Sequence, residues 1–167
     1  MDTPLVYLTG TPGTGKSTLG QYLVEQVLPD AELVEINPLL HKNGLAESYD
    51  QPRDSWVYDI GRAAKVVEEV LAARKSPTVL AGAPLPLVKT RFSVVGVLTC
   101  SLPQLLRRRL EARGYHQAKV EENLQAELLG EVLGNVLDWL APKSPVCELD
   151  SCTSTLEALA EDLATYL

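Results

Sequence analysis

The chain has 167 residues, 46% of them hydrophobic and 22% charged, and a net charge of −7 at pH 7. This length predicts one domain with an ample core, and the acidic balance excludes a generally basic nucleic-acid binder. The longest apolar run, near residues 92–102, is too short to span a bilayer, and the N-terminus does not resemble a signal peptide, so we expect no membrane association and no leader.

The first predicted elements flank a glycine-rich loop. A short apolar run predicts a buried strand over residues 4–9, and apolar residues at helical spacing predict a helix over residues 15–28. Between them, residues 10–18 read Gly-Thr-Pro-Gly-Thr-Gly-Lys-Ser-Thr and match the phosphate-binding pattern G-x-x-x-x-G-K-[ST] at every fixed position. The pattern places the Lys16 ammonium on the terminal phosphates of a nucleotide and the Ser17 hydroxyl on a magnesium ion.

The rest of the chain alternates between strands and helices. This alternation predicts an α/β fold with a five-stranded parallel sheet that helices cover on both faces. The predicted elements, in order, are a strand over 32–36, a loop or short-helix segment over 37–52, a helix over 59–74, strands over 78–81 and 93–99, a helix from Pro103 to Gly114 with Ser101 as its N-cap, a long helix over about 117–140, a strand over 146–149, and a helix from an N-cap at Ser154 to about Tyr166.

Three cysteines, Cys100, Cys147 and Cys152, lie in the second half of the chain. Their spacing fits no metal site, and their odd number argues against a disulfide framework. The pattern is typical of a protein from a reducing compartment.

A basic cluster precedes the predicted helix end at Gly114. Arg109 and Arg113 are four residues apart, so they share one face of the helix. Guanidinium groups in this position are suited to clamp nucleotide phosphates or to stabilise charge during phosphoryl transfer. The alternative is a solvated basic face that interacts favourably with the helix dipole.

The stretch from Arg109 to Glu127 continues as Arg-Leu-Glu-Ala-Arg-Gly-Tyr-His-Gln-Ala-Lys-Val-Glu-Glu-Asn-Leu-Gln-Ala-Glu. Together with the glycine-rich loop, it resembles adenylate kinase isoenzyme 6, a family of small P-loop ATPases, similar to nucleoside monophosphate kinases, that act in maturation of the small ribosomal subunit. Residues 49–50 and 57–59 are similar to the monophosphate-binding segment of that family. The resemblance covers nearly the whole chain.

The resemblance implies a P-loop NTP hydrolase fold in a single domain over residues 1–167, with a monophosphate-binding segment at about 36–59 and a short lid at about 112–122. It implies an adenylate kinase or ATPase that uses ATP or ADP with Mg²⁺. The residues that it implies for nucleotide binding are Gly13, Thr14, Gly15, Lys16, Ser17, Thr18 and Arg113. Ser17 would also bind the metal, and Lys16, Arg109 and Arg113 would be catalytic.

The resemblance also implies partners. We expect AMP or another nucleoside monophosphate as the acceptor, a small-subunit ribosomal protein as a binding partner, and pre-ribosomal RNA as an indirect one. The expected state is a monomer, in the nucleus and cytoplasm of a eukaryote or in the cytoplasm of an archaeon.

This sequence departs from the family at the end of the third predicted strand. The family has an Asp and a His there, and this chain has Ala81 and Ala83 around Gly82. Because a methyl group neither coordinates a cation nor accepts a proton, we expect impaired turnover. The alternative is that another carboxylate serves, with Asp54 and Asp59 as candidates.

The remaining polar positions have structural interpretations. Glu122, Asn123 and Glu127 match family positions but are expected to cap and solvate their helix. His41 is expected at the surface, although it could touch a substrate, and His116 is expected to mark a helix entry. Asn37-Pro38 stands where the family often has an Asp, which puts ordinary AMP recognition in doubt.

Two other functions fit the same sequence. One is a nucleotide-gated binding protein with little or no turnover, and the other is a P-loop kinase that phosphorylates a different small molecule. The phosphate-binding loop is common to all of these interpretations.

Overall fold

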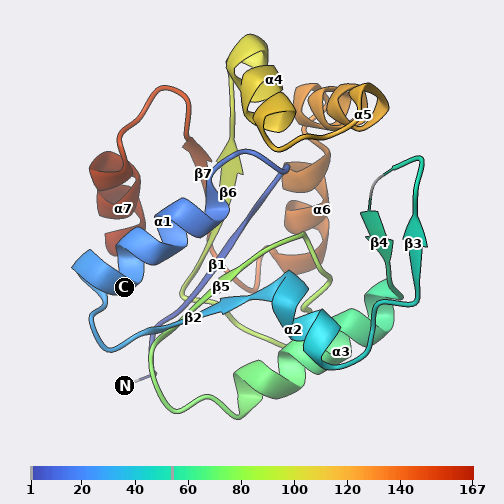
Figure 1. Ribbon diagram of the computed structural model, residues 1–167. Coiled ribbons are helices and arrows are strands. Elements are labelled where there is room, and N and C mark those ends of the chain that lie inside the picture. Colours follow the sequence, from blue (N-terminus) through green and yellow to red (C-terminus); the bar gives the residue numbers. More distant parts are fainter. Residues whose placement is uncertain (1, 54) are drawn as a thin grey trace.

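A parallel sheet of five strands forms the centre of the computed structural model, which describes residues 2–53 and 55–167 (Figure 1). The strand order is β2-β5-β1-β6-β7, and every neighbouring pair is parallel. The bounds are β1 Leu5–Gly10, β2 Glu32–Glu35, β5 Thr78–Ala81, β6 Val94–Thr99 and β7 Val146–Asp150. This architecture confirms the predicted fold class and all five predicted strands. The prediction succeeded because runs of apolar and β-branched residues are typical of strands buried on both faces.

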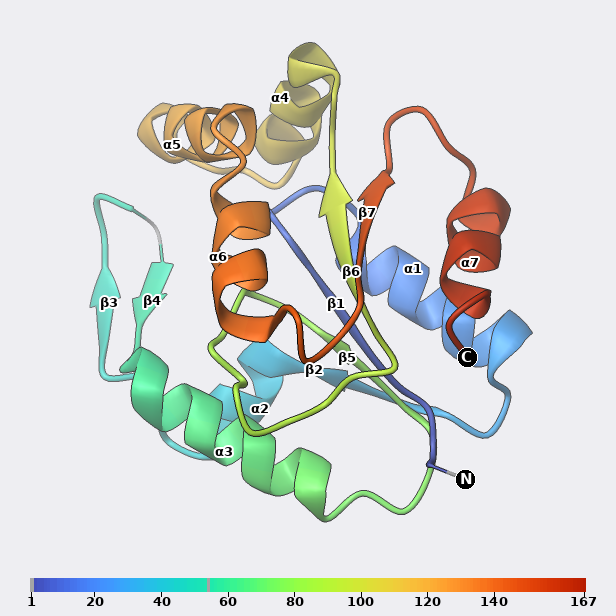
Figure 2. The same cartoon turned by 180° about the vertical axis from the view of Figure 1, so that it is seen from behind.

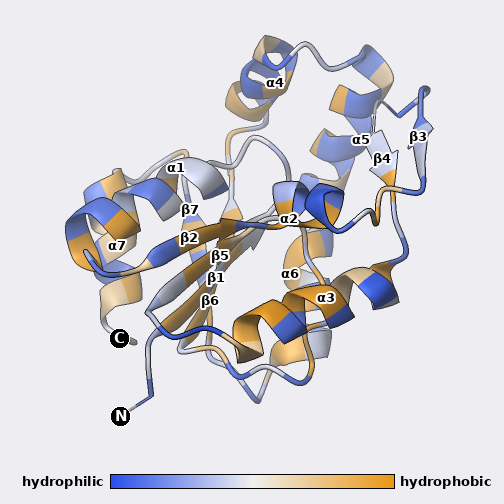
Figure 3. Ribbon diagram, turned by 60° about the horizontal axis from the view of Figure 1, so that its bottom comes forward, coloured by the Kyte–Doolittle hydropathy of each residue, from blue (hydrophilic) through white to orange (hydrophobic). Residues whose placement is uncertain are grey.

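Helices cover both faces of the sheet (Figures 1 and 3). On one face lie α1 (Lys16–Tyr22), its π-helical continuation (Leu23–Val27) and α7 (Leu156–Ala164), which pack on a core that includes Leu8, Leu19 and Leu159. On the other face lie α2 (Ile36–Lys42), α3 (Ile60–Ala72) and α6 (Glu131–Leu140), packed on a second core that includes Tyr7 and Phe92. In Figure 3 the apolar colour follows the strands and the inward faces of these helices.

Two further units stand at the carboxyl edge of the sheet. Helices α4 (Pro103–Ala112) and α5 (Gln117–Leu128) pack against each other there, and a hairpin of β3 (Ser48–Asp50) and β4 (Ser55–Val57) stands beside them (Figure 2). These units surround the loops that follow β1 and β5. Among the described residues, no helix is long and apolar enough to cross a bilayer.

Several predicted boundaries were wrong. The segment 37–52, predicted as a loop or short helix, does contain a short helix, α2, which begins at Ile36, but the strand β3 that follows was not predicted. The long helix predicted over 117–140 is two helices, since Gly130 adopts a left-handed φ of 64° that ends the first helix and turns the chain into α6.

Two predicted N-caps were also wrong by one residue. Leu102, not Ser101, precedes α4, because Pro103 occupies the first helical position and fixes where the helix begins. Thr155, not Ser154, caps α7, and its hydroxyl accepts a hydrogen bond from the Ala158 N–H at 3.1 Å.

The expectation about the cysteines was wrong as well. Cys100 and Cys152 form a disulfide, and Cys147 stays free. Cys100 directly follows β6 and Cys152 follows β7, so the carboxyl ends of two adjacent parallel strands bring the two sulfurs together. A count of cysteines carries no information about this proximity.

Candidate nucleotide-binding site

The phosphate-binding loop connects the carboxyl end of β1 to α1, as predicted. Within it, the Thr14 hydroxyl donates to the Thr11 carbonyl at 2.7 Å, and the Thr14 N–H donates to the same oxygen at 3.3 Å. These bonds fold the loop into a tight turn before α1, and a glycine-rich loop at a helix N-terminus at the carboxyl edge of the sheet binds anions favourably.

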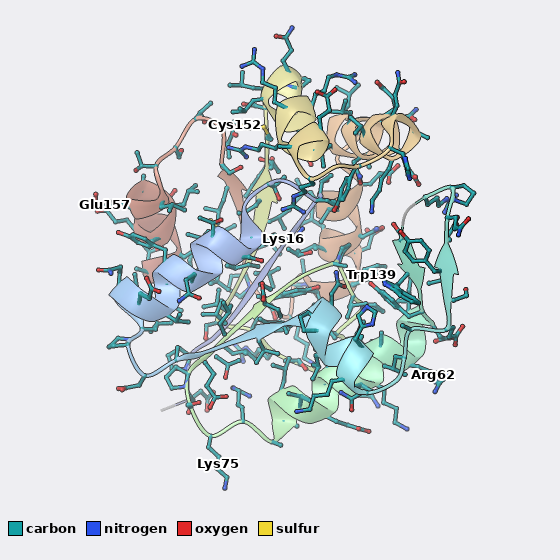
Figure 4. The ribbon with its side chains drawn as sticks, in the orientation of Figure 1. Lys16, Arg62, Lys75, Trp139, Cys152 and Glu157 are labelled. Carbon is teal, nitrogen blue, oxygen red and sulfur yellow. A yellow bond between two sulfur atoms is a disulfide. The ribbon has the colours of Figure 1, made fainter. Side chains whose placement is uncertain are left out.

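Lys16 is half-buried and folds back over its own loop (Figure 4). Its Nζ donates to the Gly10 carbonyl at 2.6 Å and to the Thr11 carbonyl at 3.3 Å. Burial lowers the pKa of this ammonium group to about 8; the Arg113 cation also lowers it, and the Glu127 carboxylate opposes the shift. Phosphate oxygens in this space would replace the two carbonyls as partners and would favour the charged form.

The two predicted arginines have different surroundings. Arg109 is half-buried; one of its nitrogens donates to the Gly13 carbonyl and to Ser151 Oγ, both at 3.2 Å, and the other donates to the Ser151 carbonyl at 3.5 Å. It therefore ties α4 to the phosphate-binding loop and to the loop after β7. Arg113 is exposed at the end of α4, with Nη1 3.5 Å from the Tyr115 hydroxyl, so it is the guanidinium that can reach a ligand.

Two cavities border the phosphate-binding loop. The first, of about 480 Å³, lies between the loop, α4 and the segment after β7 and is lined by Gly13, Thr18, Arg109, Arg113 and Ser151. The second, of about 550 Å³, begins at the adjacent residue Pro12. Adjacent residues of one loop thus line two spaces of ligand size.

The second cavity lies between the hairpin, α2 and α5. The Trp56 ring contacts both His41 and Tyr49 edge-on, with centroids 5.2 Å and 5.1 Å apart. At its far side, Lys119 Nζ lies 3.9 Å from the centre of the Tyr115 ring. Arg53 at the hairpin tip reaches Glu122 of α5 at 4.0 Å, so the hairpin and α5 meet across the cavity.

Ala81 and Ala83 lie where the sequence predicted them, at the end of β5. Ala81 is 3% exposed and packs in the core under α1, whereas the Ala83 carbonyl accepts a hydrogen bond from Tyr7 Oη at 2.5 Å. The same oxygen of Tyr7 accepts from the Leu85 N–H at 3.0 Å, and burial raises the pKa of this phenol. Tyr7, which the sequence did not single out, thus holds the backbone after β5.

Of the two alternative carboxylates, Asp59 has a structural role in the described residues. Asp59 caps α3 by accepting a hydrogen bond from the Arg62 N–H at 2.9 Å. Asp54 lies outside the described residues.

A carboxylate that sequence reasoning missed touches the phosphate-binding loop. Ser17 Oγ donates to Glu35 Oε1 at 2.6 Å, and both residues are exposed. Glu35 is the last residue of β2, and the carboxyl edge of a parallel sheet is where ligand-binding side chains gather. That position was the one signal available in the sequence.

The remaining sequence-predicted residues make contacts within and between the helices, or lie at the surface. Glu127 accepts a hydrogen bond from the Cys100 N–H at 2.9 Å, and Asn123 Nδ2 donates to the Lys119 carbonyl at 3.0 Å, which are structural roles. His116 is the N-cap residue of α5 without a side-chain capping bond, and His41 is exposed at the rim of the second cavity.

Oxygen donors suitable for magnesium are present beside the loop. Ser17 and Glu35 supply a hydroxyl and a carboxylate, which are the ligand types that Mg²⁺ prefers. Among the described residues, no group of three or more His, Cys, Asp or Glu side chains could hold a metal ion on its own. The residues therefore fit an ion that arrives with nucleotide phosphates.

Known proteins match this chain over most of its length. The family model described as an AAA domain matches residues 6–130. A Saccharomyces cerevisiae protein named adenylate kinase isoenzyme 6 homolog FAP7 is 34% identical over 151 residues, which are 90% of this chain and 74% of that protein. A Caenorhabditis elegans adenylate kinase isoenzyme 6 homolog is 31% identical over 161 residues, or 96% of this chain and 85% of that protein.

Solved structures share the fold. A sugar kinase from Janibacter sp. superposes with a TM-score of 0.66 at 21% identity and covers 99% of this chain and 94% of its own. Shikimate kinase from Acinetobacter baumannii gives a TM-score of 0.63 at 19% identity, with 96% of this chain and 90% of the other covered. The P-loop, the parallel sheet and these sequence matches together show that the chain is an adenylate kinase-like P-loop protein and belongs to the family of the adenylate kinase isoenzyme 6 homologues.

Proposed function

We propose that this protein transfers the γ-phosphoryl group of ATP to a nucleoside monophosphate, with AMP as the first candidate acceptor. The observation that carries the proposal is the pair of cavities, about 480 Å³ and 550 Å³, whose linings include the adjacent loop residues Gly13 and Pro12. A kinase for two nucleotides needs donor and acceptor sites whose reacting phosphates meet at one point. The names of the relatives add support for adenylate chemistry.

The donor fits the cavity beside α4. Its phosphates would lie on the loop amides and Lys16, and its adenosine would extend between Arg109, Arg113 and the segment after β7. Arg113 is exposed and lines this cavity, and its charge contributes to the lowered pKa of the Lys16 ammonium group. That placement suits stabilisation of the charge that develops on the transferring phosphoryl group.

The acceptor fits the cavity under the hairpin. Trp56 and Tyr58 offer aromatic surface for a base, whereas Arg53 and Lys119 bring positive charge that suits a monophosphate. Because Arg53 and Glu122 connect the hairpin to α5, closing these two units over the acceptor would exclude water from the transfer.

In the transfer itself, an acceptor phosphate oxygen attacks the γ-phosphorus and the bond to the β-phosphate oxygen breaks, which leaves ADP and a nucleoside diphosphate. Magnesium, when bound, neutralises charge on the β- and γ-phosphates. Lys16 and Arg113 hold the phosphate oxygens in line. Ala81 and Ala83 offer no side-chain group to orient the acceptor, which favours slow turnover and keeps a nucleotide-gated binding protein as the second candidate.

We extend the proposal to a role in small ribosomal subunit assembly and pre-rRNA processing, through a small-subunit ribosomal protein. The family resemblance supports it, and the net charge of −7 suits a basic partner. Affinity capture of purified basic small-subunit ribosomal proteins, with ADP and with a non-hydrolysable ATP analogue, tests this part. Equal absence of binding in both states would contradict it.

The kinase proposal is tested by following the phosphorus resonances of ATP and AMP in one sample. We expect ADP to accumulate from both nucleotides, and no accumulation with Lys16→Ala. A panel of other monophosphates and of small-molecule acceptors distinguishes an adenylate kinase from another P-loop kinase. ATP turnover that is independent of every acceptor would instead favour an ATPase.

A further inference from the structure

The hydroxyl of Ser17 has a carboxylate as its hydrogen-bond partner. Ser17 Oγ lies 2.6 Å from Glu35 Oε1, at a position where both side chains are open to solvent. An exposed serine has water as an alternative partner at little cost. The contact therefore reflects how β2 and α1 are placed relative to each other.

The packing beneath this pair fixes that placement. Leu33 and Glu35 are two residues apart on β2, so their side chains point to the same face of the sheet. Leu33 packs in the core under α1, and a Cβ atom at Gly20 would lie only 2.9 Å from Leu33 Cδ1. Since Ser17 is one helical turn before Gly20, the close approach of α1 to β2 at Gly20 brings Ser17 to Glu35.

The neighbouring strand offers no competing group. Ala81, the last residue of β5, is the register partner of Glu35, and its methyl group lies in the same core as Leu33. Adjacent strands are about 4.8 Å apart, a gap that the long side chain of a glutamate can span. Glu35 therefore places a carboxylate beside the Ser17 hydroxyl from β2, which is one strand farther from β1 than β5 is.

We propose that Glu35, together with Ser17, holds the magnesium ion of the bound nucleotide. Because the Ser17 hydroxyl donates its hydrogen bond to Glu35, the lone pairs of the hydroxyl oxygen remain available to a cation. The second carboxylate oxygen of Glu35 can bind the same cation or one of its water ligands. Glu35 thereby supplies the negative charge that the alanine at the end of β5 lacks. The inference rests on the proposed nucleotide binding and concerns its metal alone.

The test measures metal affinity without turnover. Mn²⁺ serves as the probe, and electron paramagnetic resonance reports its binding to the ADP complex of the whole chain. Glu35→Gln keeps the size of the side chain and removes its charge. We expect Mn²⁺ affinity in the ADP complex to fall about 10- to 100-fold. ADP affinity in the presence of EDTA, measured by calorimetry, should stay unchanged.

Two further variants make the result specific. Glu32→Gln removes an exposed carboxylate from the other end of the same strand and should leave Mn²⁺ affinity unchanged. Glu35→Asp keeps the charge on a shorter side chain and should lose less affinity than Glu35→Gln. Unfolding in urea confirms that each variant is folded.

The inference is overturned if Glu35→Gln binds Mn²⁺ in the ADP complex as tightly as the unmodified chain, or if the Gln and Asp variants lose affinity equally. Failure of the proposed nucleotide binding, on which the inference rests, is a different result. In that case the unmodified chain would bind no ADP even in EDTA, and the inference would fall with it.

Discussion

Sequence spacing predicts similar roles for Arg109 and Arg113, whereas the structure shows different surroundings for the two side chains. Arg109 donates to the Gly13 carbonyl and to both oxygens of Ser151, at 3.2–3.5 Å, whereas Arg113 is exposed at the end of α4. Arg109→Ala removes these three contacts and leaves the two carbonyls without a charged partner.

The magnitude follows from the number and burial of these contacts. One hydrogen bond to a charged group contributes about 1.5–3 kcal/mol, and the 3.5 Å contact is weak. Because Arg109 is half-buried, water replaces part of the loss, and we expect the free energy of unfolding to fall by about 1–3 kcal/mol. For a chain of this length, that is a decrease of roughly 2–12 °C in Tm.

Urea unfolding followed by circular dichroism measures this change, with Arg113→Ala as the matched control on the same helix. Arg113→Ala should stay within about 0.5 kcal/mol of the unmodified protein and should lower phosphoryl transfer instead. Equal stability of the two variants would refute the structural role of Arg109. A large loss of stability in Arg113→Ala would show that the Arg113 side chain belongs to a buried ion pair.

Three further changes have defined outcomes. Lys16→Ala should weaken ADP binding by about 1–3 kcal/mol in calorimetry, because a charged hydrogen-bond donor to phosphate is lost; unchanged affinity would contradict the loop assignment. Reducing the disulfide between Cys100 and Cys152 should lower the free energy of unfolding by about 2–4 kcal/mol, because the unfolded chain regains the conformational freedom that the cross-link removes. Urea titration with and without reductant measures this change, and coincident curves would mean that the bond contributes nothing. Ala81→Asp combined with Ala83→His should raise ATP turnover roughly 30- to 1000-fold in a coupled assay if these positions limit catalysis, and no gain from a fully active starting protein would show that the catalytic groups lie elsewhere.

Local sequence signals predicted the elements that are buried on both faces and the loop with a fixed pattern. The strands at 5–10 and 94–99 are continuous apolar runs between turn residues, and such runs have few alternatives in a parallel sheet. The phosphate-binding loop was also placed correctly, because its glycines, lysine and serine lie at a fixed spacing between a strand and a helix.

The errors came from interactions between distant residues. The pairing of β3 with β4 depends on short exposed strands that carry little apolar periodicity, and the disulfide depends on two strand ends that meet only in the folded sheet. Glu35 was missed because its partner, Ser17, belongs to another strand–helix unit. Tyr7 was missed because a buried tyrosine in a strand reads as core until the partners of its hydroxyl are known.

We propose that two nucleotides bind next to one phosphate-binding loop, one in each of the two cavities. Calorimetric titration with diadenosine pentaphosphate tests this proposal most directly, because this compound occupies donor and acceptor sites at once and requires no turnover. We expect the unmodified chain to bind it at least about tenfold more tightly than ADP, since the second site adds contacts without a second loss of translational freedom. We also expect Lys16→Ala to lose much of that affinity. Binding no tighter than that of ADP would contradict a two-nucleotide kinase.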